Sequence, residues 1–260
     1  MTDGVAVRAL SSIEECREAA TLIDRIWGET RIVTPELLWA MTTHGGLVLV
    51  AERDGVLVGA QMGFLGLVDD ELVLHSHVTG VPDDAQHAGI GFALKRAQRD
   101  WSVARGIATV TWTFDPLIAR NAYFNLHKLG AMAVRFLPDF YGPMNDAFNA
   151  GDRTDRLEVR WELHSERVER ALQGAPVDAD IAGAEPLLED ADGRPRLRTG
   201  VDSARLLVTV PPDYLSLRST DAAAAASWRD AVATALGQAM GRGYRGVDVH
   251  RPATYVLERS

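Results

Sequence analysis

Hydrophobic positions along the first 165 residues follow two periods, one typical of strands and one typical of amphipathic helices. Alternation and short β-branched runs predict strands at residues 5–10, 47–52, 56–67, 71–81, 108–114, 131–136 and 156–163. Helical spacing, with capping residues such as Ser12 and Thr34 in front of it, predicts helices at residues 12–27, 35–44, 89–105 and 117–129. This order, β-α-α-β-β-β-α-β-α-β-β, indicates an α/β (α+β) fold with a mixed central sheet flanked by helices.

The rest of the chain is less regular. Residues 166–203 are expected to be a linker or irregular segment, because residues 175–200 are rich in Pro, Asp, Ala and Gly. The hydrophobic pattern of residues 204–260 predicts a β-α-β-β subdomain, in which Asp221 caps the helix. This extension carries no motif of its own. Three roles stay open for it: to extend the first sheet, to mimic half of a domain of the same kind, or to form a lid or dimer surface. We expect its role to be structural.

Composition narrows the classes of function. The chain has 260 residues, 47% of them hydrophobic, with 27 Lys and Arg against 36 Asp and Glu, a formal net charge of −9. This balance disfavours nucleic-acid binding, which needs clustered basic residues. No segment approaches the ~20 apolar residues of a membrane span, and the N-terminus lacks the pattern of a secretory signal. We therefore expect a cytoplasmic protein, and the single cysteine, Cys16, excludes internal disulfides.

The segment Gln86-His87-Ala88-Gly89-Ile90-Gly91 lies between an expected strand and an expected helix. Glycines at 89 and 91 let the backbone approach an anionic group, and the first-turn N–H groups of a helix donate to phosphate oxygens. The pattern is neither a Rossmann fingerprint nor a P-loop. It predicts a pyrophosphate-binding turn, with an ordinary glycine-containing β–α turn as the alternative.

The strand before this turn carries candidate acid–base groups. His75, His77 and Thr79 are expected on one face, because side chains alternate along a strand. An imidazole titrates near neutrality and suits a general base, so His77 and His75 are the catalytic candidates, with Glu71 as an outside candidate acting through water. Two histidines at i, i+2 without a third ligand nearby do not indicate a metal site. No metal is expected.

These residues resemble the GNAT superfamily of acyl-CoA-dependent N-acyltransferases. The hallmark of that superfamily, Gln/Arg-x-x-Gly-x-Gly/Ala between its fourth strand and third helix, matches Gln86–Gly91 at every fixed position. The element order over residues 5–163 matches too, and a two-part subgroup of predicted acetyltransferases is suggested by SHVTGV, LKRAQRDW, WTFDPLIARNAYFNLHKLGA and DRLEVRW. The resemblance implies a mostly antiparallel sheet. It further implies that backbone groups of Val81, His87, Ala88, Gly89, Ile90 and Gly91 bind the pantetheine and pyrophosphate of acetyl-CoA or another acyl-CoA.

Two departures from the family pattern affect the site. Pro82 lies four residues before Gln86, where the family usually leaves three, so the loop is one residue longer. The Tyr that many members use as general acid toward the leaving thiolate is replaced by Leu126, and Tyr123, nearly one turn earlier, is the substitute candidate. Asn121 and Asn125, one turn apart, are candidates to hydrogen-bond pantetheine amides, or are simply solvated.

The sequence thus predicts an acyl-CoA N-acyltransferase that works by direct attack of an amine on the thioester. The expected acceptor is a small-molecule amine or an amino acid. Arg120, Arg135 or Arg156 would hold a carboxylate on the acceptor or on an acyl group such as succinyl. The alternatives are a non-catalytic acyl-CoA-binding or regulatory module and a protein N-acetyltransferase. A homodimer remains open.

Overall fold

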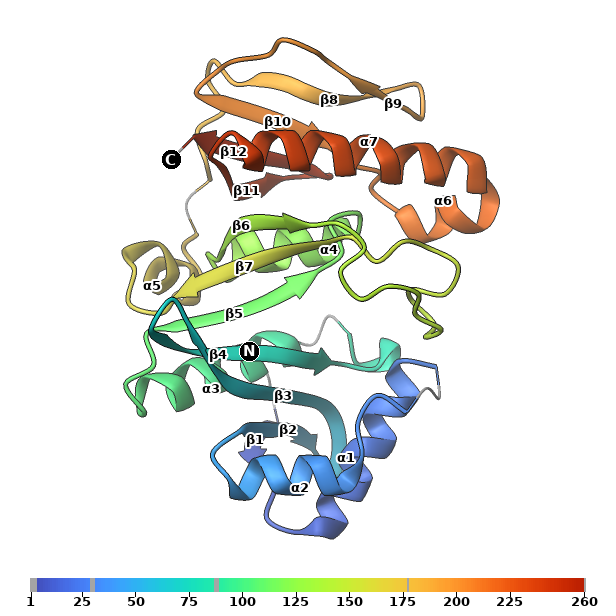
Figure 1. Cartoon of the computed structure of the whole chain (residues 1–260). Coiled ribbons are helices and arrows are strands. Elements are labelled where there is room, and N and C mark those ends of the chain that lie inside the picture. The colour runs from blue at the N-terminus through green and yellow to red at the C-terminus, as the bar shows by residue number, and fades with distance from the viewer. Residues whose placement is uncertain (1–3, 29–30, 87–88, 177, 260) are drawn as a thin grey trace. The chain divides into compact units, whose positions relative to one another are not determined.

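The computed structural model describes residues 4–28, 31–86, 89–176 and 178–259. The chain forms two compact units, which are coloured by residue number in Figure 1. The first comprises Met1–Trp112 and Met144–Asp152, and the second comprises Thr113–Pro143 and Arg153–Ser260. No helix among the described residues is both long enough and apolar enough to span a bilayer.

The sheet of the first unit has the order β1-β2-β3-β4-β5. Its strands are β1 (Val5–Ala9), β2 (Leu47–Arg53), β3 (Val56–Val68), β4 (Glu71–Gly80) and β5 (Thr109–Phe114). Neighbours are antiparallel except β4 and β5, which are parallel. A hairpin with an Asp-Gly turn joins β2 to β3 at the position between the two strands predicted there, with φ angles of 51° at Asp54 and 79° at Gly55.

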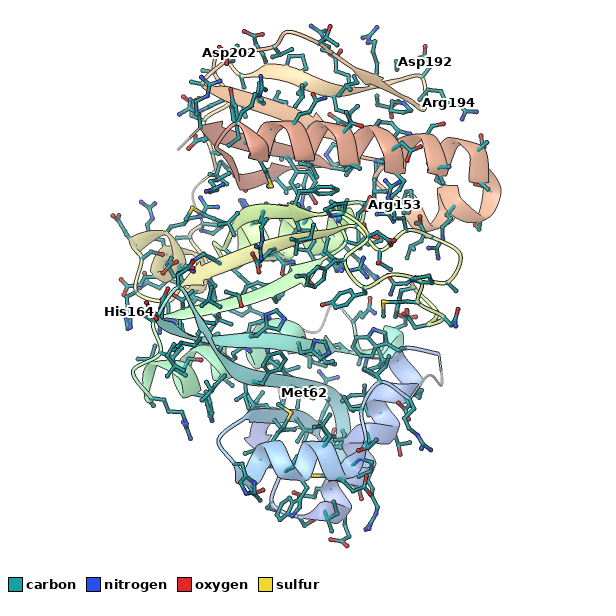
Figure 2. All side chains as sticks on the ribbon, viewed as in Figure 1. Met62, Arg153, His164, Asp192, Arg194 and Asp202 are labelled. Atoms are coloured by element: carbon teal, nitrogen blue, oxygen red, sulfur yellow. The ribbon has the colours of Figure 1, made fainter. Side chains whose placement is uncertain are left out.

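Helices cover both faces of this sheet. On one face lie α1 (Ile13–Ile26) and α2 (Pro35–Thr43), capped by the side chains of Ser12 and Thr34 as predicted. They bury a core that includes Met62, labelled in Figure 2, and Val78. On the other face, α3 (Ile90–Val103) packs Ile90 and Leu94 so closely on Gly59 that a Cβ there would lie 2.9 Å from Ile90. Helices therefore pack on both faces of the sheet that contains β3 and β4.

The second unit has a sheet of order β7-β6-β11-β12-β10-β8-β9, antiparallel except for β10 with β8. Its elements are α4 (Ala119–Ala122), a π-helix (Tyr123–Lys128), β6 (Met132–Leu137), β7 (Arg156–Glu162), α5 (Glu166–Leu172), β8 (Glu185–Ala191), β9 (Arg194–Leu197), β10 (Arg205–Thr209), α6 (Tyr214–Thr220), α7 (Ala222–Gly241), β11 (Tyr244–His250) and β12 (Thr254–Arg259). Gly246 of β11 pairs with Ala133 of β6, so the C-terminal extension continues a sheet that begins before residue 165.

The structure corrects three sequence expectations. Residues 166–203 are not an irregular linker, since they contain α5, β8 and β9, and β8 pairs with β10. The β-α-β-β extension is present, with the short helix α6 added before α7. The helix expected at residues 117–129 is α4 followed by the π-helix. Each miss involves an element that depends on packing or on a local change of helical period, which hydrophobic spacing does not encode.

Candidate functional site

A β-bulge on β4 shapes the first part of the site. Met62 of β3 lies opposite Val78 and Gly63 lies opposite Ser76, so His77 is the extra residue of the bulge. Bulges of this kind re-aim a side chain and are frequent beside functional sites. The pairing of β4 with β5 covers Val73–His75 in the described residues, whereas β4 continues to Gly80. After His75, the backbone N–H and C=O groups of β4 that face β5 are therefore outside the pairing seen in the described residues, and a ligand could bind to them.

The bulge keeps the two histidines together but separates Thr79 from them. The rings of His75 and His77 lie 6.2 Å apart, and both pack against Phe64, at 5.2 and 6.0 Å. Thr79 lies opposite Gln61, whose side chain donates to Ser76 Oγ at 3.3 Å, so Thr79 shares the face of Ser76. The expectation of a common face is confirmed for the histidines and wrong for Thr79, because the extra residue shifts the alternation by one.

Both histidines are held in their neutral form near pH 7. Burial, together with the nearby charges of His77 and Lys95, lowers the pKa of His75 to about 4. Partial desolvation by the surrounding protein also lowers the pKa of His77. His75 Nδ1 lies 3.1 Å from the hydroxyl oxygen of Thr111, whereas His77 is exposed. His77 thus has the more accessible ring, and His75 has the more fixed one.

The opposite face of β4 holds a buried lysine that the sequence analysis missed. Lys95 of α3 is 3% exposed and donates from Nζ to Ser76 Oγ at 2.9 Å and to Gln98 Oε1 at 3.1 Å. Its Nζ also lies 3.9 Å from the centre of the Trp112 ring. Burial lowers the pKa of Lys95 to about 7. Ser76 sits between the two histidines in the chain, so Lys95 supports the bulge from behind.

The turn from β4 to α3 ends in a glycine that begins the helix. Gly89 is the N-cap of α3 with a φ of 75°, a left-handed conformation that favours glycine, and it brings no side chain to cap the helix. The side chain of Ile90 is buried, so this residue can meet a ligand only through its backbone. Gln86 donates to Asp83 Oδ1 at 2.5 Å and to Val81 O at 3.4 Å. His87 and Ala88, also expected in the turn, lie outside the described residues.

Aromatic residues that the sequence analysis did not single out border the end of β4. A Cβ on Gly80 would lie 2.5 Å from the Trp27 ring, so only glycine fits at this point. Trp27 meets Phe148 edge to face, with ring centres 6.4 Å apart, and its carbonyl accepts from Ala147 N at 3.2 Å. A pocket of about 320 Å³ opens nearby, lined by Arg25, Ile26, Pro82, Asp83 and Asp84. Phe148 and Ala147 belong to the long loop 139–156 between β6 and β7, and a loop of this length is the feature of the sequence that points to a functional role.

In the second unit, the candidate residues lie on α4 and the π-helix. Asn121 is exposed and Asn125 is 5% exposed, because the wider π turn separates two residues that would share a face in an α-helix. Leu126, where the family often has its acid, is fully buried. The Tyr123 ring stacks on His127 at 4.6 Å, and the Arg251 guanidinium lies 4.5 Å from its centre.

The candidate carboxylate-binding arginines have partners of their own. Arg135 contacts Glu158 at 3.1 Å, and Arg156 is 7% exposed and donates to the carbonyl of Asp155 at 2.9 Å. Arg120 is exposed. None of the three stands out as a carboxylate receptor.

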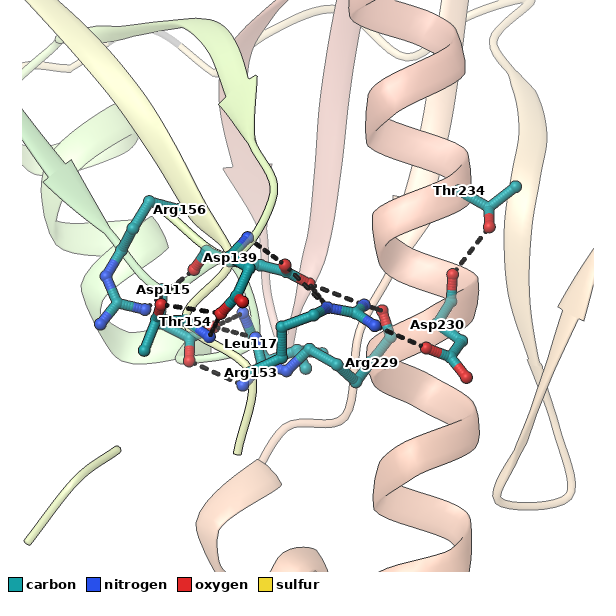
Figure 3. A network of polar contacts seen from close by, with 10 residues as sticks. Asp115, Leu117, Asp139, Arg153, Thr154, Arg156, Arg229, Asp230 and Thr234 are labelled. Atoms are coloured by element: carbon teal, nitrogen blue, oxygen red, sulfur yellow. Dashed lines mark hydrogen bonds and ion pairs between the residues drawn. The ribbon is translucent and has the colours of Figure 1, made fainter. Parts of the chain in front are cut away.

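A polar network anchors the ends of loop 139–156 within the second unit (Figure 3). Arg229 of α7 binds both carboxylate oxygens of Asp115 at 2.8 Å. Arg153 bridges Asp155 and Asp230, and the Asp139 carboxylate accepts from Thr154 N at 3.1 Å. The bond between Thr154 and Asp139 joins the two ends of the loop, and the bond between Arg153 and Asp230 ties one end to α7.

Solved structures similar to this chain are acetyltransferases. The ribosomal-protein-S18-alanine N-acetyltransferase of Escherichia coli is 16% identical, covers 62% of this chain and 95% of its own, and has a TM-score of 0.50. A GNAT-family acetyltransferase of Streptococcus pneumoniae is 13% identical, with coverages of 60% and 97% and the same TM-score. The protein yncA of Salmonella typhimurium, solved with its cofactor acetyl-CoA, is 18% identical, with coverages of 62% and 95% and again a TM-score of 0.50. No protein-family model matches the sequence, and no curated protein matches it significantly. At these identities the likeness concerns the fold, and the chain has the fold of the GNAT superfamily.

Proposed function

We propose that the protein is an N-acyltransferase that transfers an acyl group from acyl-CoA to the amine of a small molecule or amino acid. The observation that carries the proposal is the course of β4. This strand has a bulge at His77, continues beyond its pairing with β5, and leads into the glycine-capped N-terminus of α3. An extended amide chain and an anionic group attached to it fit such a path.

The residues present suit acyl-CoA. In this proposal the free edge of β4 up to Val81 binds the amides of the pantetheine arm. The backbone N–H groups of Gly89, Ile90 and Gly91 bind the pyrophosphate, with His87, Ala88 and the side chain of Gln86 completing the turn. Asn121 and Asn125 stay candidates for further amide contacts. The similar fold of yncA, solved with acetyl-CoA, supports the choice of ligand.

The acyl-CoA supplies a thioester, a carbonyl that a neutral amine attacks directly. His77 accepts the proton that the amine loses, since its ring is exposed and its lowered pKa keeps it neutral near pH 7. His75 positions His77 through their shared contact with Phe64. The new bond joins the amine nitrogen to the acyl carbon, the carbon–sulfur bond breaks, and Tyr123 is the candidate that protonates the leaving thiolate.

The test is release of free CoA thiol from acetyl-CoA and succinyl-CoA in the presence of a panel of amines, amino acids and peptides. Amine-dependent release is the expected result, and the preferred pair identifies acyl group and acceptor. The burial of Leu126, where a tyrosine would serve as the acid, favours a second candidate, a non-catalytic acyl-CoA-binding module. Binding without turnover of any amine would support that candidate, and peptide-only turnover would indicate a protein acetyltransferase.

A further inference from the structure

Three side chains from separate segments converge in the second unit, away from any motif visible in the sequence. His127 comes from the π-helix, Asp248 from β11, and Asp178 from the connection that follows α5. His127 Nδ1 lies 3.1 Å from Asp248 Oδ1 and 3.7 Å from Asp178 Oδ1. One ligand atom from each residue lies within 4.8 Å of the other two.

These atoms match the ligand set and spacing of a zinc-class cation. Such ions bind imidazole nitrogen and carboxylate oxygen at about 2.0–2.2 Å, usually with tetrahedral geometry. Ligand atoms around a tetrahedral ion are then about 3.3–3.6 Å apart, by geometry from those bond lengths. The two separations that involve His127, 3.1 and 3.7 Å, lie on either side of this range, and the ligand atoms of Asp178 and Asp248 lie within 4.8 Å of each other. Side-chain movements, chiefly of the exposed Asp178, would bring the three atoms to coordinating positions.

The surroundings fix two of the three groups in place. Asp248 is fully buried, and its carboxylate accepts from Val249 N and Ala179 N, both at 2.8 Å. The stack on Tyr123 fixes the plane of the His127 ring. An ionised carboxylate accepts about four hydrogen bonds or ligand contacts, so Asp248 keeps capacity for a metal ion. Contacts of this kind are what orient the ligands in established metal sites.

The local charge also favours a dication. The half-buried guanidinium of Arg167 donates to the carbonyls of Leu126, Gly130 and Val247, and it is close enough to Asp248 for the two charges to interact. With Arg167 positive, and Asp178 and Asp248 both negative, one negative charge is left over. His250 Nε2 lies 3.9 Å from Asp248 Oδ2 but donates to the carbonyl of Ala179 at 3.1 Å, so the fourth ligand position is left to a water molecule.

We propose that His127, Asp178 and Asp248 bind one zinc-class divalent cation that ties the connection after α5 to β11 and the π-helix. The proposed ion is structural. It would order Asp178, whose side chain is 82% exposed, and hold the helix that carries Tyr123. The proposal is independent of the transferase function and departs from the expectation, drawn from the histidine pair on β4, that the chain binds no metal.

The test is titration calorimetry of the full chain with ZnCl₂ after chelator treatment, together with the visible spectrum of the Co²⁺-loaded protein. The decisive variant is Asp178→Asn, because an exposed residue can be changed without disturbing folding. Asp180→Asn is the matched control, since Asp180 is 66% exposed, lies two residues away and contacts only Arg205 among charged groups in the described structure.

We expect about one equivalent of zinc and a tetrahedral cobalt spectrum for the wild type and for Asp180→Asn. Asp178→Asn should bind zinc about 10–100-fold more weakly, a loss typical of an impaired metal site. Lack of stoichiometric zinc binding by the wild type would overturn the proposal, and so would equal affinity in the two variants. The thermal shift caused by zinc provides a readout that does not depend on enzyme activity.

Discussion

The two faces of β4 carry polar residues of similar chemistry in opposite settings. One face presents His75 and His77 beside the exposed ring of Phe64. The other buries Lys95 against Ser76, Gln98 and Trp112. Both faces contain bases whose pKa values are lowered by burial, yet only His77 is exposed.

This difference in exposure gives the two faces different roles: the histidine face can take part in a reaction, and the Lys95 face supports the structure. An exposed neutral imidazole can exchange a proton with a substrate, whereas a buried ammonium bound to neutral acceptors can only stabilise or destabilise the fold. Buried Gln61 Oε1 and Gln98 Nε2 lack hydrogen-bond partners among the described residues, so the Lys95 face is not fully satisfied. We infer that the protein tolerates this cost because Lys95 helps to hold the bulge that positions His77.

The largest effect on catalysis is expected from the substitution His77→Gln. Loss of the general base should lower kcat by ~10²-fold or more, with the free energy of unfolding nearly unchanged. In the wild type, kcat/KM should fall as the pH drops through the pKa of His77, below 6.5, and this acid limb should disappear in the variant. Steady-state kinetics across pH, with the exposed His164→Gln as control, measures both effects. Wild-type activity in His77→Gln would exclude His77 as the base.

Substitution of Lys95 should change the free energy of unfolding and its pH dependence rather than kcat. The pKa of Lys95 is about 7 in the folded protein, against 10.5 for a solvent-exposed lysine. Between these values the unfolded chain binds more protons, so this residue makes the free energy of unfolding rise with pH, by up to ~1.4 kcal/mol per pH unit. Urea unfolding at several pH values should show this rise in the wild type and its loss in Lys95→Met. An identical pH dependence in both proteins would contradict the burial argument.

A smaller effect is expected from Thr111→Val. This change removes the hydroxyl 3.1 Å from His75 Nδ1 while keeping the shape of the side chain. One hydrogen bond contributes about 1 kcal/mol, so kcat should fall about fivefold, and the pH at which the acid limb occurs should shift. Thr79→Val, on the Lys95 face, is the control and should leave both unchanged. Equal losses in the two variants would mean that the faces are not distinct.

Much of the first unit could be predicted from the sequence, because its signals are local. Ser12, Thr34 and the Asp54-Gly55 pair fix helix starts and a hairpin whatever the tertiary context. The glycine turn before α3 and the histidine pair were found for the same reason. The bulge was not, since it arises from the pairing of β4 with β3 and leaves no mark on the alternation of residues.

In the second unit, several features depend on contacts between distant residues and could not be predicted from local sequence signals. β8 contains Pro186 and several acidic residues, and it forms a strand only because β10 and β9 pair with it. Asp192-Gly193, with φ angles of 55° and 82°, is a hairpin signal that went unused. The cluster of His127, Asp178 and Asp248 joins residues up to 121 positions apart, and no local pattern predicts it.

The central claim, that acyl-CoA binds at the turn from β4 to α3, is tested most directly by a thermal-shift panel with CoA, acetyl-CoA and succinyl-CoA. The decisive variant is Gly89→Asp, which places a side chain and a negative charge at the proposed pyrophosphate-binding end of α3. Gly106→Asp is its control, because Gly106 follows the same helix with a similar φ of 71° and open space around it. Stabilisation of the wild type and of Gly106→Asp, but not of Gly89→Asp, is the predicted result. If no CoA species stabilises the wild type, or if all three proteins respond equally, the claim is wrong.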